Sequence, residues 1–151
     1  MLILRIFNRI IFFLILLPTL ACAETVKLED MIINSDHLKI NQTTMEATFN
    51  GSVVLWFNNG IIIETDKLII TATELNNKRR PEKITIPYKF RAIQNEKNNN
   101  TTIIGDKAEY IFRTEELKLS GNINIQSEEN FIKCEELVYL TNLKNITTKD
   151  K

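Results

Sequence analysis

The chain has 151 residues, with 19 Lys and Arg, 19 Asp and Glu, one His and two Cys, and a formal net charge of +0. No basic surplus is present to bind nucleic acid through counterion release, so we expect no nucleic-acid partner. His37 is the single histidine, which argues against a zinc site of ordinary composition and against a catalytic triad. With no Gly-rich phosphate loop either, we predict no enzyme, cofactor or metal site.

The first residues have the pattern of a secretory signal. Arg5 and Arg9 supply positive charge, residues 10–17 (IIFFLILL) form an apolar run, and Ala21-Cys22-Ala23 places small side chains where signal peptidase cuts. Because a membrane-spanning helix needs about 20 apolar residues, we predict that residues 1–23 are cleaved. An uncleaved membrane anchor is the alternative.

Cleavage would leave residues 24–151 as a single domain with 17 basic and 19 acidic residues, a net charge of −2. Cys134 would then be the only cysteine, and we expect it to be a small core hydrophobe.

The rest of the chain alternates between apolar and polar residues in the manner of strands. The alternation is clear at residues 47–49, 53–57, 117–119 and 123–125, and Asn50-Gly51, Asn59-Gly60 and Gly121-Asn122 are turn signals. Only Val26 to Ile33 suits a short helical turn. The pattern therefore predicts an all-β fold.

The middle of the chain is interrupted by polar segments. Residues 76–81 (NNKRRP) are interpreted as a turn, and residues 94–101 (QNEKNNNT) as a polar loop. Between them, Ile84, Ile86, Tyr88 and Phe90 would share one face of a strand, with Pro87 marking a bend or an edge strand.

The chain also repeats itself at an offset of 70 residues. Asp36–Ile40 aligns with Asp106–Tyr110, and Gly51–Leu55 aligns with Gly121–Ile125, while shorter copies surround Asp66 and Glu136. Such repetition indicates hairpin units stacked along an axis. One carboxylate per unit does not converge as metal ligands must, so we expect each to stabilise a turn by accepting backbone N–H bonds.

These repeats carry a family resemblance. Thr102–Tyr110 (TIIGDKAEY), followed by Leu117–Ile123 (LKLSGNI), resembles the signature of the LptA/OstA proteins, and Ser35–Val54 resembles the same unit in an N-terminal version. The resemblance covers about residues 32–140, and it departs from the family at Cys134-Glu135-Glu136, where Gly-Asp is usual.

The resemblance implies an open β-jellyroll of repeated antiparallel hairpins whose interior accepts the acyl chains of lipopolysaccharide. It also implies a bridge across the periplasm, from an inner-membrane LptC-like jellyroll to an outer-membrane LptD-like assembly protein, in which members join end to end.

The groove and the assembly edges follow from residue parity together with this resemblance. The predicted lipid-binding residues are Leu38, Ala47, Phe49, Val53, Leu55, Phe57, Ile63, Leu68, Tyr110, Leu117, Leu119, Ile123 and Ile125, with Ile40, Ile70 and Ala108 extending the same face. The predicted assembly edges contain Ile32, Ile33, Val138 and Tyr139.

Three alternatives stay open. The lipid-binding residues would otherwise fill a closed core. Lys78-Arg79-Arg80 suits either the phosphates of lipid A or a solvated turn. The whole protein would otherwise be an LptC-like membrane-anchored scaffold or a ligand-free structural β-domain of the envelope.

Overall fold

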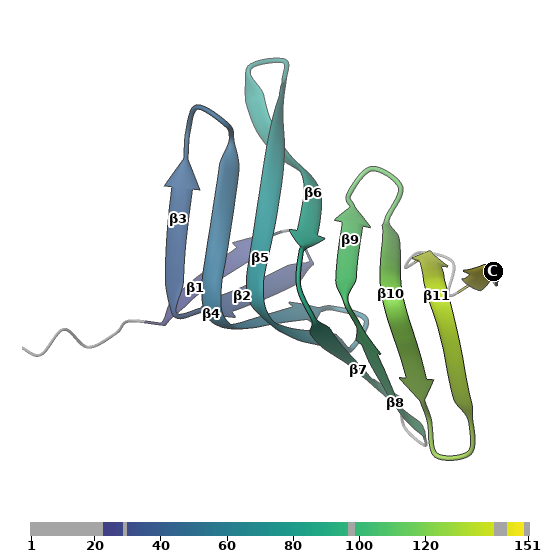
Figure 1. Ribbon diagram of the computed structural model, residues 1–151. Helices are drawn as coiled ribbons and strands as arrows, with labels where there is room; N and C mark the ends of the chain where they lie inside the picture. Colours follow the sequence, from purple (N-terminus) through teal and green to yellow (C-terminus); the bar gives the residue numbers. More distant parts are fainter. Residues whose placement is uncertain (1–22, 29, 97–98, 141–144, 150–151) are drawn as a thin grey trace, which may run out of the picture.

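The structure, a computed structural model, describes residues 23–28, 30–96, 99–140 and 145–149, and every regular element in it is a β-strand (Figure 1). The all-β prediction is confirmed. No described segment forms a helix long and apolar enough to span a membrane. The predicted signal lies outside the described residues except for Ala23.

The strands form one 12-stranded antiparallel sheet. They are β1 (Glu24–Leu28), β2 (Met31–Ser35), β3 (His37–Asn41), β4 (Glu46–Phe57), β5 (Ile61–Leu75), β6 (Lys78–Ile86), β7 (Phe90–Glu96), β8 (Asn99–Gly105), β9 (Lys107–Ile111), β10 (Glu116–Gln126), β11 (Phe131–Leu140) and β12 (Asn145–Lys149). The helical turn expected within residues 26–33 is wrong, because β1 and β2 pair there as a hairpin.

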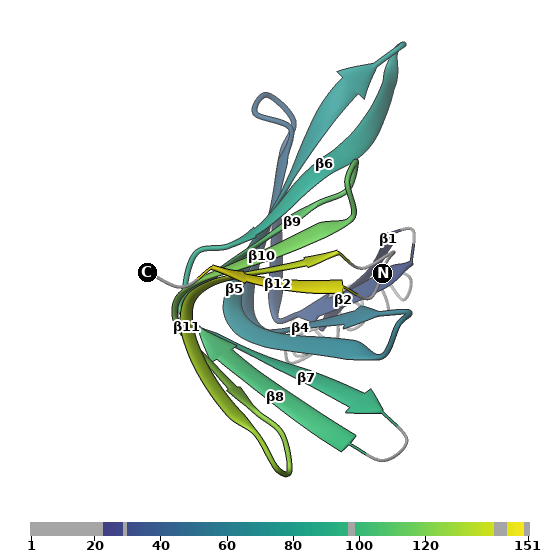
Figure 2. The same cartoon turned by 90° about the vertical axis from the view of Figure 1, so that its right-hand side faces the viewer.

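The sheet is folded into two layers. Pairing orders the upper layer β3-β4-β5-β6-β9-β10-β11-β12 and the lower layer β1-β2-β4-β5-β7-β8-β10-β11. Strands β4, β5, β10 and β11 belong to both layers because each bends at its middle. The layers therefore meet along a bent side, called the vertex here, and separate toward an open side, called the mouth (Figure 2).

Two β-bulges make the bends of β4 and β10. The pairing register shifts between Asn50 and Val53 and again between Ser120 and Ile123, and positive φ angles occur at Gly51 (76°) and Gly121 (79°). The sequence predicts a hairpin turn at each of these glycines. This prediction is wrong, because β4 and β10 each continue past the glycine. A bulge needs the same left-handed backbone as a turn, and here it carries the strand from one layer to the other.

The acidic residue of each repeat lies beside its bulge. The N–H of Asp36 donates to the carbonyl of Gly51 at 3.0 Å, and the N–H of Asp106 donates to that of Gly121 at 2.9 Å. The Asp106 carboxylate accepts from Asn122 Nδ2 at 2.6 Å. Asp36 and Asp106 therefore stabilise bends, as expected, but with different groups. Their backbone N–H groups donate to the glycine carbonyls, whereas the prediction had their carboxylates accepting backbone N–H bonds.

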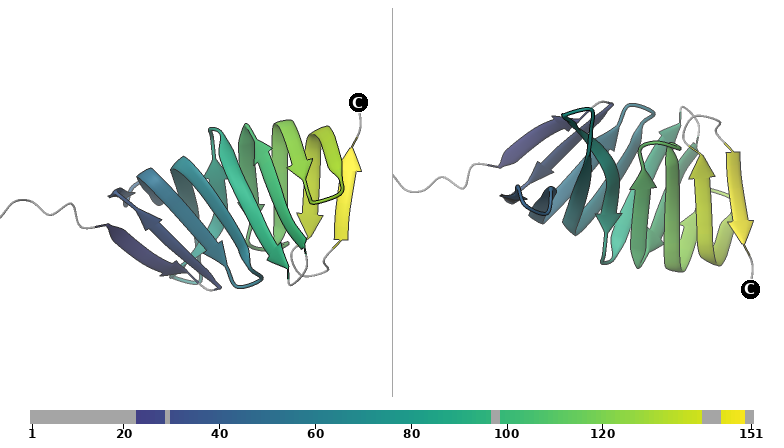
Figure 3. Two further views of the ribbon diagram at one scale, coloured as in Figure 1. Left: turned by 90° about the horizontal axis from the view of Figure 1, so that it is seen from below. Right: turned by 90° about the horizontal axis from the view of Figure 1, so that it is seen from above.

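The 70-residue repeat is also a structural repeat. Strand β3 at residues 37–41 corresponds to β9 at residues 107–111, and the turns that follow place Met45 (φ 53°) and Glu115 (φ 52°) at equivalent positions. Figure 3 shows the resulting units following one another along the molecule from its N-terminal to its C-terminal end.

Two of the segments expected to be irregular are largely strand. The turn at residues 76–81 is restricted to Asn76 and Asn77, whose φ angles are 52° and 59°, and residues 78–81 belong to β6. The loop expected at residues 94–101 is wrong, because β7 and β8 pair as far as Glu96 and Asn99. The bend at Pro87 is confirmed: β6 ends at Ile86, and β7 begins at Phe90 in the other layer.

Candidate functional site

The inner faces of the two layers are built by period-two alternation, so each inward residue lies beside another from the next strand. In the lower layer one such row runs, by direct pairing, through Val26, Ile33, Leu55, Ile63, Ala92, Ile103, Ile125 and Ile132. In the upper layer an equivalent row contains Ile84, Tyr110, Leu117 and Tyr139. The space between the layers is thus apolar.

The N-terminal half of this space is filled. Phe49, Val53, Leu55, Ile63 and Leu68 are each at most 1% exposed and belong to the core cluster. This burial is what the closed-core alternative predicts for this part of the groove.

The C-terminal half contains a cleft of about 100 Å³. It is lined by Ile61, Ala92, Ile93, Gln94, Thr101, Ile103, Leu117, Leu119, Ile125, Leu137 and Tyr139. Leu117, Leu119 and Ile125 had been predicted as lipid-binding residues. Because both layers contribute apolar walls, the cleft suits an apolar ligand.

Several lining residues were missed from the sequence. Ile61, Ala92, Ile103 and Leu137 line the cleft without having been predicted, and Tyr139 had been placed at an assembly edge. A signal was present for Leu137 and Tyr139, since they follow the same alternation two residues apart. Ala92 and Ile103 required knowledge that residues 94–101 are a hairpin of strands.

An aromatic contact joins the layers beside the cleft. The rings of Phe57, from the lower layer, and Tyr110, from the upper layer, lie 5.4 Å apart at 68°, and Tyr110 and Phe112 lie 5.2 Å apart at 80°. Tyr110 pairs with Leu117, which lines the cleft. Phe57 and Tyr110 are 8% and 7% exposed, so this pair, called the aromatic bridge here, closes the interior next to the cleft.

The other predicted groove residues divide by depth. Ile123, Ala108 and Ile70 are buried, whereas Leu38 and Ala47 are half-buried against the core. Ile40 has the inward parity but is 66% exposed, because its strand β3 pairs with β4 alone.

The predicted assembly edges are wrong in position. Ile32 and Ile33 lie in β2, which pairs with β1 and β4. Val138 and Tyr139 lie in β11 where it pairs with β10 and β12. A strand bonded on both sides has no free edge, so the edges belong to strands further out. They are β1 and β3 at one end, and β12 and residues 131–134 of β11 at the other.

The ionisable groups of the described residues form no cluster that would hold a metal ion. His37 is exposed on β3, and the thiol of Cys134 is half-buried against the core. The polar residues that line the cleft are Gln94 and Thr101.

An open two-layer jellyroll with an apolar cleft between its layers defines the class of this protein: an antiparallel β-scaffold whose two layers enclose an apolar cleft. Residues 32–145 match the family described as LptA/(LptD N-terminal domain) LPS transport protein, and the chain belongs to that family.

Two further comparisons give a relative in sequence and a similar fold. A Rickettsia prowazekii (strain Madrid E) chain, "Uncharacterized protein RP507", is 30% identical over 135 residues, which cover 89% of this chain and 90% of the relative. The crystal structure of LptH from Pseudomonas aeruginosa is similar in fold, with a TM-score of 0.64 at 15% identity, covering 80% of this chain and 82% of that one. LptH is titled the LptA homologous periplasmic component of the lipopolysaccharide transport device of that organism.

Proposed function

We propose that the protein is secreted into the periplasm, where it holds the acyl chains of lipopolysaccharide between its layers and passes them from the inner membrane toward the outer membrane. The observation that carries this proposal is the apolar cleft between the layers, in a chain of a lipopolysaccharide transport family. Each buried CH₂ contributes about 0.8 kcal/mol, so apolar contact alone is sufficient to hold an acyl chain.

The cleft must widen to admit a chain. Its volume of about 100 Å³ is below the range of about 300–1,000 Å³ that is typical of small-molecule pockets. Among the described residues, the bent strands β4, β5, β10 and β11 join the layers at the vertex, so we expect the layers to part at the mouth. Parting the aromatic bridge costs the area that its two rings bury and about 0.5–1.5 kcal/mol more for the ring contact, and the buried methylene groups of an acyl chain would offset both.

Transfer between membranes also requires docking, and the free edges supply it. Large apolar side chains are exposed at both ends of the sheet: Ile40 (66%) on β3, and Phe131 (60%) and Ile132 (48%) on β11. Strand addition at these ends would join the protein to an LptC-like jellyroll, to an LptD-like assembly protein or to a second copy of itself.

A photo-crosslinking experiment in cells tests the cleft. A photoreactive residue at Leu117 or Ile125, which line the cleft, should label lipopolysaccharide, whereas one at Lys118 or Asn124, on the opposite face of the same strand, should not. Equal labelling at all four positions would refute the cleft as the site. No labelling at any of them would favour the ligand-free structural domain.

The mature N-terminus tests secretion. Protein recovered from the periplasm should begin at Glu24, and its intact mass should show this directly. A full-length species confined to membranes would instead identify the LptC-like anchored scaffold.

A further inference from the structure

The β5–β6 hairpin extends beyond both neighbouring strands. The pairing of β4 with β5 ends at Glu46 and Thr71, and the pairing of β6 with β9 ends at Lys83 and Ile111. Beyond the backbone bond from the N–H of Ala72 to the carbonyl of Met45 (2.9 Å), residues 73–80 have backbone pairing only with the opposite strand of the hairpin, among the described residues. Figure 2 shows this hairpin continuing the upper layer outward on the open side of the molecule.

The charges of the hairpin turns at the mouth differ between the two layers. Within the described residues, the lower-layer turns contain Asp30, Glu128 and Glu129 and no Lys or Arg. The upper-layer turns contain Arg113 with Glu115 in the same turn and, on the β5–β6 hairpin, residues 78–80 (KRR), all of them exposed. The described basic residues of these turns thus gather on the upper rim, most of them on the β5–β6 hairpin, and they attract an anionic group there.

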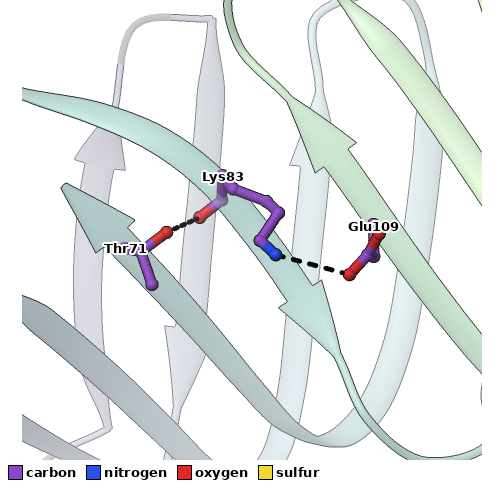
Figure 4. A network of polar contacts seen from close by, with 3 residues as sticks. All are labelled: Thr71, Lys83 and Glu109. Atoms are coloured by element: carbon purple, nitrogen blue, oxygen red, sulfur yellow. Dashed lines mark hydrogen bonds and ion pairs between the residues drawn. The ribbon is translucent and has the colours of Figure 1, made fainter. Parts of the chain in front are cut away.

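The basic side chains of the hairpin, residues 78–80, form none of the ion pairs found in the described residues, so their N–H donors are open to a ligand. The ion pairs found in the described part of the chain join Lys83 to Glu109 (Figure 4), Arg91 to Glu64 and Lys118 to Glu136. None of them uses residues 78–80. Figure 4 also shows Thr71 donating to the carbonyl of Lys83 at 3.4 Å, which links the base of the hairpin across its two strands.

Strand parity places Arg79 on the inner side of the hairpin. It pairs with Glu74, which has the same parity along β5 as the buried Ile70. Glu74 reduces the local positive charge, and Lys78 and Arg80 flank Arg79 to restore it. A guanidinium group can bind phosphate through two parallel hydrogen bonds, which a carboxylate opposite it does not prevent.

We propose that the β5–β6 hairpin is a binding site for the phosphate groups of a lipid headgroup, with Arg79 as the main contact and Lys78 and Arg80 in support. This inference rests on the proposed function, because it takes the acyl chains to lie between the layers. An amphiphile held in that way has its polar head at the mouth, and the hairpin is the basic element there.

The test compares affinities of the purified protein for two probes, bisphosphorylated lipid A and the same lipid A after enzymatic removal of its phosphates. The wild type should bind the phosphorylated form about tenfold more tightly. The variant Arg79→Gln/Arg80→Gln should lose this preference and keep its affinity for the dephosphorylated form. Arg79→Lys, which retains the charge but not the fork of donors, should lose only part of it.

The matched control is Lys107→Gln/Lys133→Gln, which removes the same charge from exposed positions outside the hairpin and should keep the preference. A loss in this control as large as in the hairpin variant would overturn the proposal in favour of general electrostatics. An unchanged preference in the hairpin variant would overturn it as well.

Two further outcomes separate the sources of failure. If the wild type binds neither form of lipid A, the proposed function fails; if it binds both forms equally, only the hairpin site fails. Inorganic phosphate alone should give no saturable, Arg79-dependent shifts in NMR spectra at 1 mM. Such shifts would identify a free-phosphate site in place of a headgroup site.

Discussion

Gly105 lies at the vertex, where β8 crosses toward β9, and it has no room for an added methyl group. A Cβ there would lie 2.5 Å from Cδ1 of Ile123 and 2.8 Å from Cε1 and Cζ of Phe90. Ile123 and Phe90 are 1% and 2% exposed, so neither has open space to move into.

The magnitude follows from this crowding. Overpacking a core costs about 1–3 kcal/mol. Replacing glycine by alanine also lowers the conformational entropy of the unfolded chain, which raises the free energy of unfolding by about 0.4–1 kcal/mol. We therefore expect Gly105→Ala to lower the free energy of unfolding by about 1–2 kcal/mol.

A second substitution, Ile123→Val, tests the same contact. It removes the Cδ1 atom of Ile123 that the methyl group of Gly105→Ala would meet. Alone it should cost about 0.5–1.5 kcal/mol. In the double variant, the deleted methyl group makes room for the added one, so the combined loss should be smaller than the sum by about 1 kcal/mol.

Urea denaturation of the four proteins, at an unchanged m-value, measures both the loss and the coupling. Losses that add to within about 0.3 kcal/mol would refute the close approach of Gly105 and Ile123.

Three further predictions concern the bends, the aromatic bridge and the edges. Gly121→Ala should destabilise the protein more than Gly60→Ala in denaturant melts: both glycines have positive φ, but a Cβ at Gly121 meets a neighbour at 2.9 Å and one at Gly60 only at 3.8 Å. A double-mutant cycle of Phe57→Leu and Tyr110→Leu should give a coupling of about 0.5–1.5 kcal/mol in the free energy of unfolding, and zero coupling would contradict the ring contact. Val138→Pro should lower the thermal midpoint of the whole domain, because a paired inner strand loses a ladder donor; an unchanged midpoint would mean that β11 is an edge at that position.

Much of the fold could be predicted from the sequence because it is repetitive and alternates with period two. The alignment of Asp36 with Asp106 located equivalent bends, and parity alone placed Leu55 and Leu119 on the inner face. Both features are local in sequence, and each inward residue at the centre of a strand had to be buried in any version of this sheet.

The remaining features depend on partners that are distant in the chain. Asn50-Gly51 has the local signal of a hairpin turn, and only the continuation of β4 onto β2 shows that it is a bulge. Likewise, the sequence shows only that Val138 is an apolar residue of a strand. It does not show that β12 pairs with that strand, which decides whether Val138 lies at an edge. Phe49 and Leu117 have the same parity, and the opposing layer alone decides that one is sealed and the other lines a cleft.

Strand spacing sets the reach of one copy. The upper layer contains the eight described strands β3, β4, β5, β6, β9, β10, β11 and β12 side by side. Neighbouring strands lie about 4.8 Å apart, so each copy added by strand pairing would lengthen an assembly by about 38 Å. A chain of copies would therefore grow in fixed steps of this size, and the number of copies needed between two membranes follows from dividing their separation by that step.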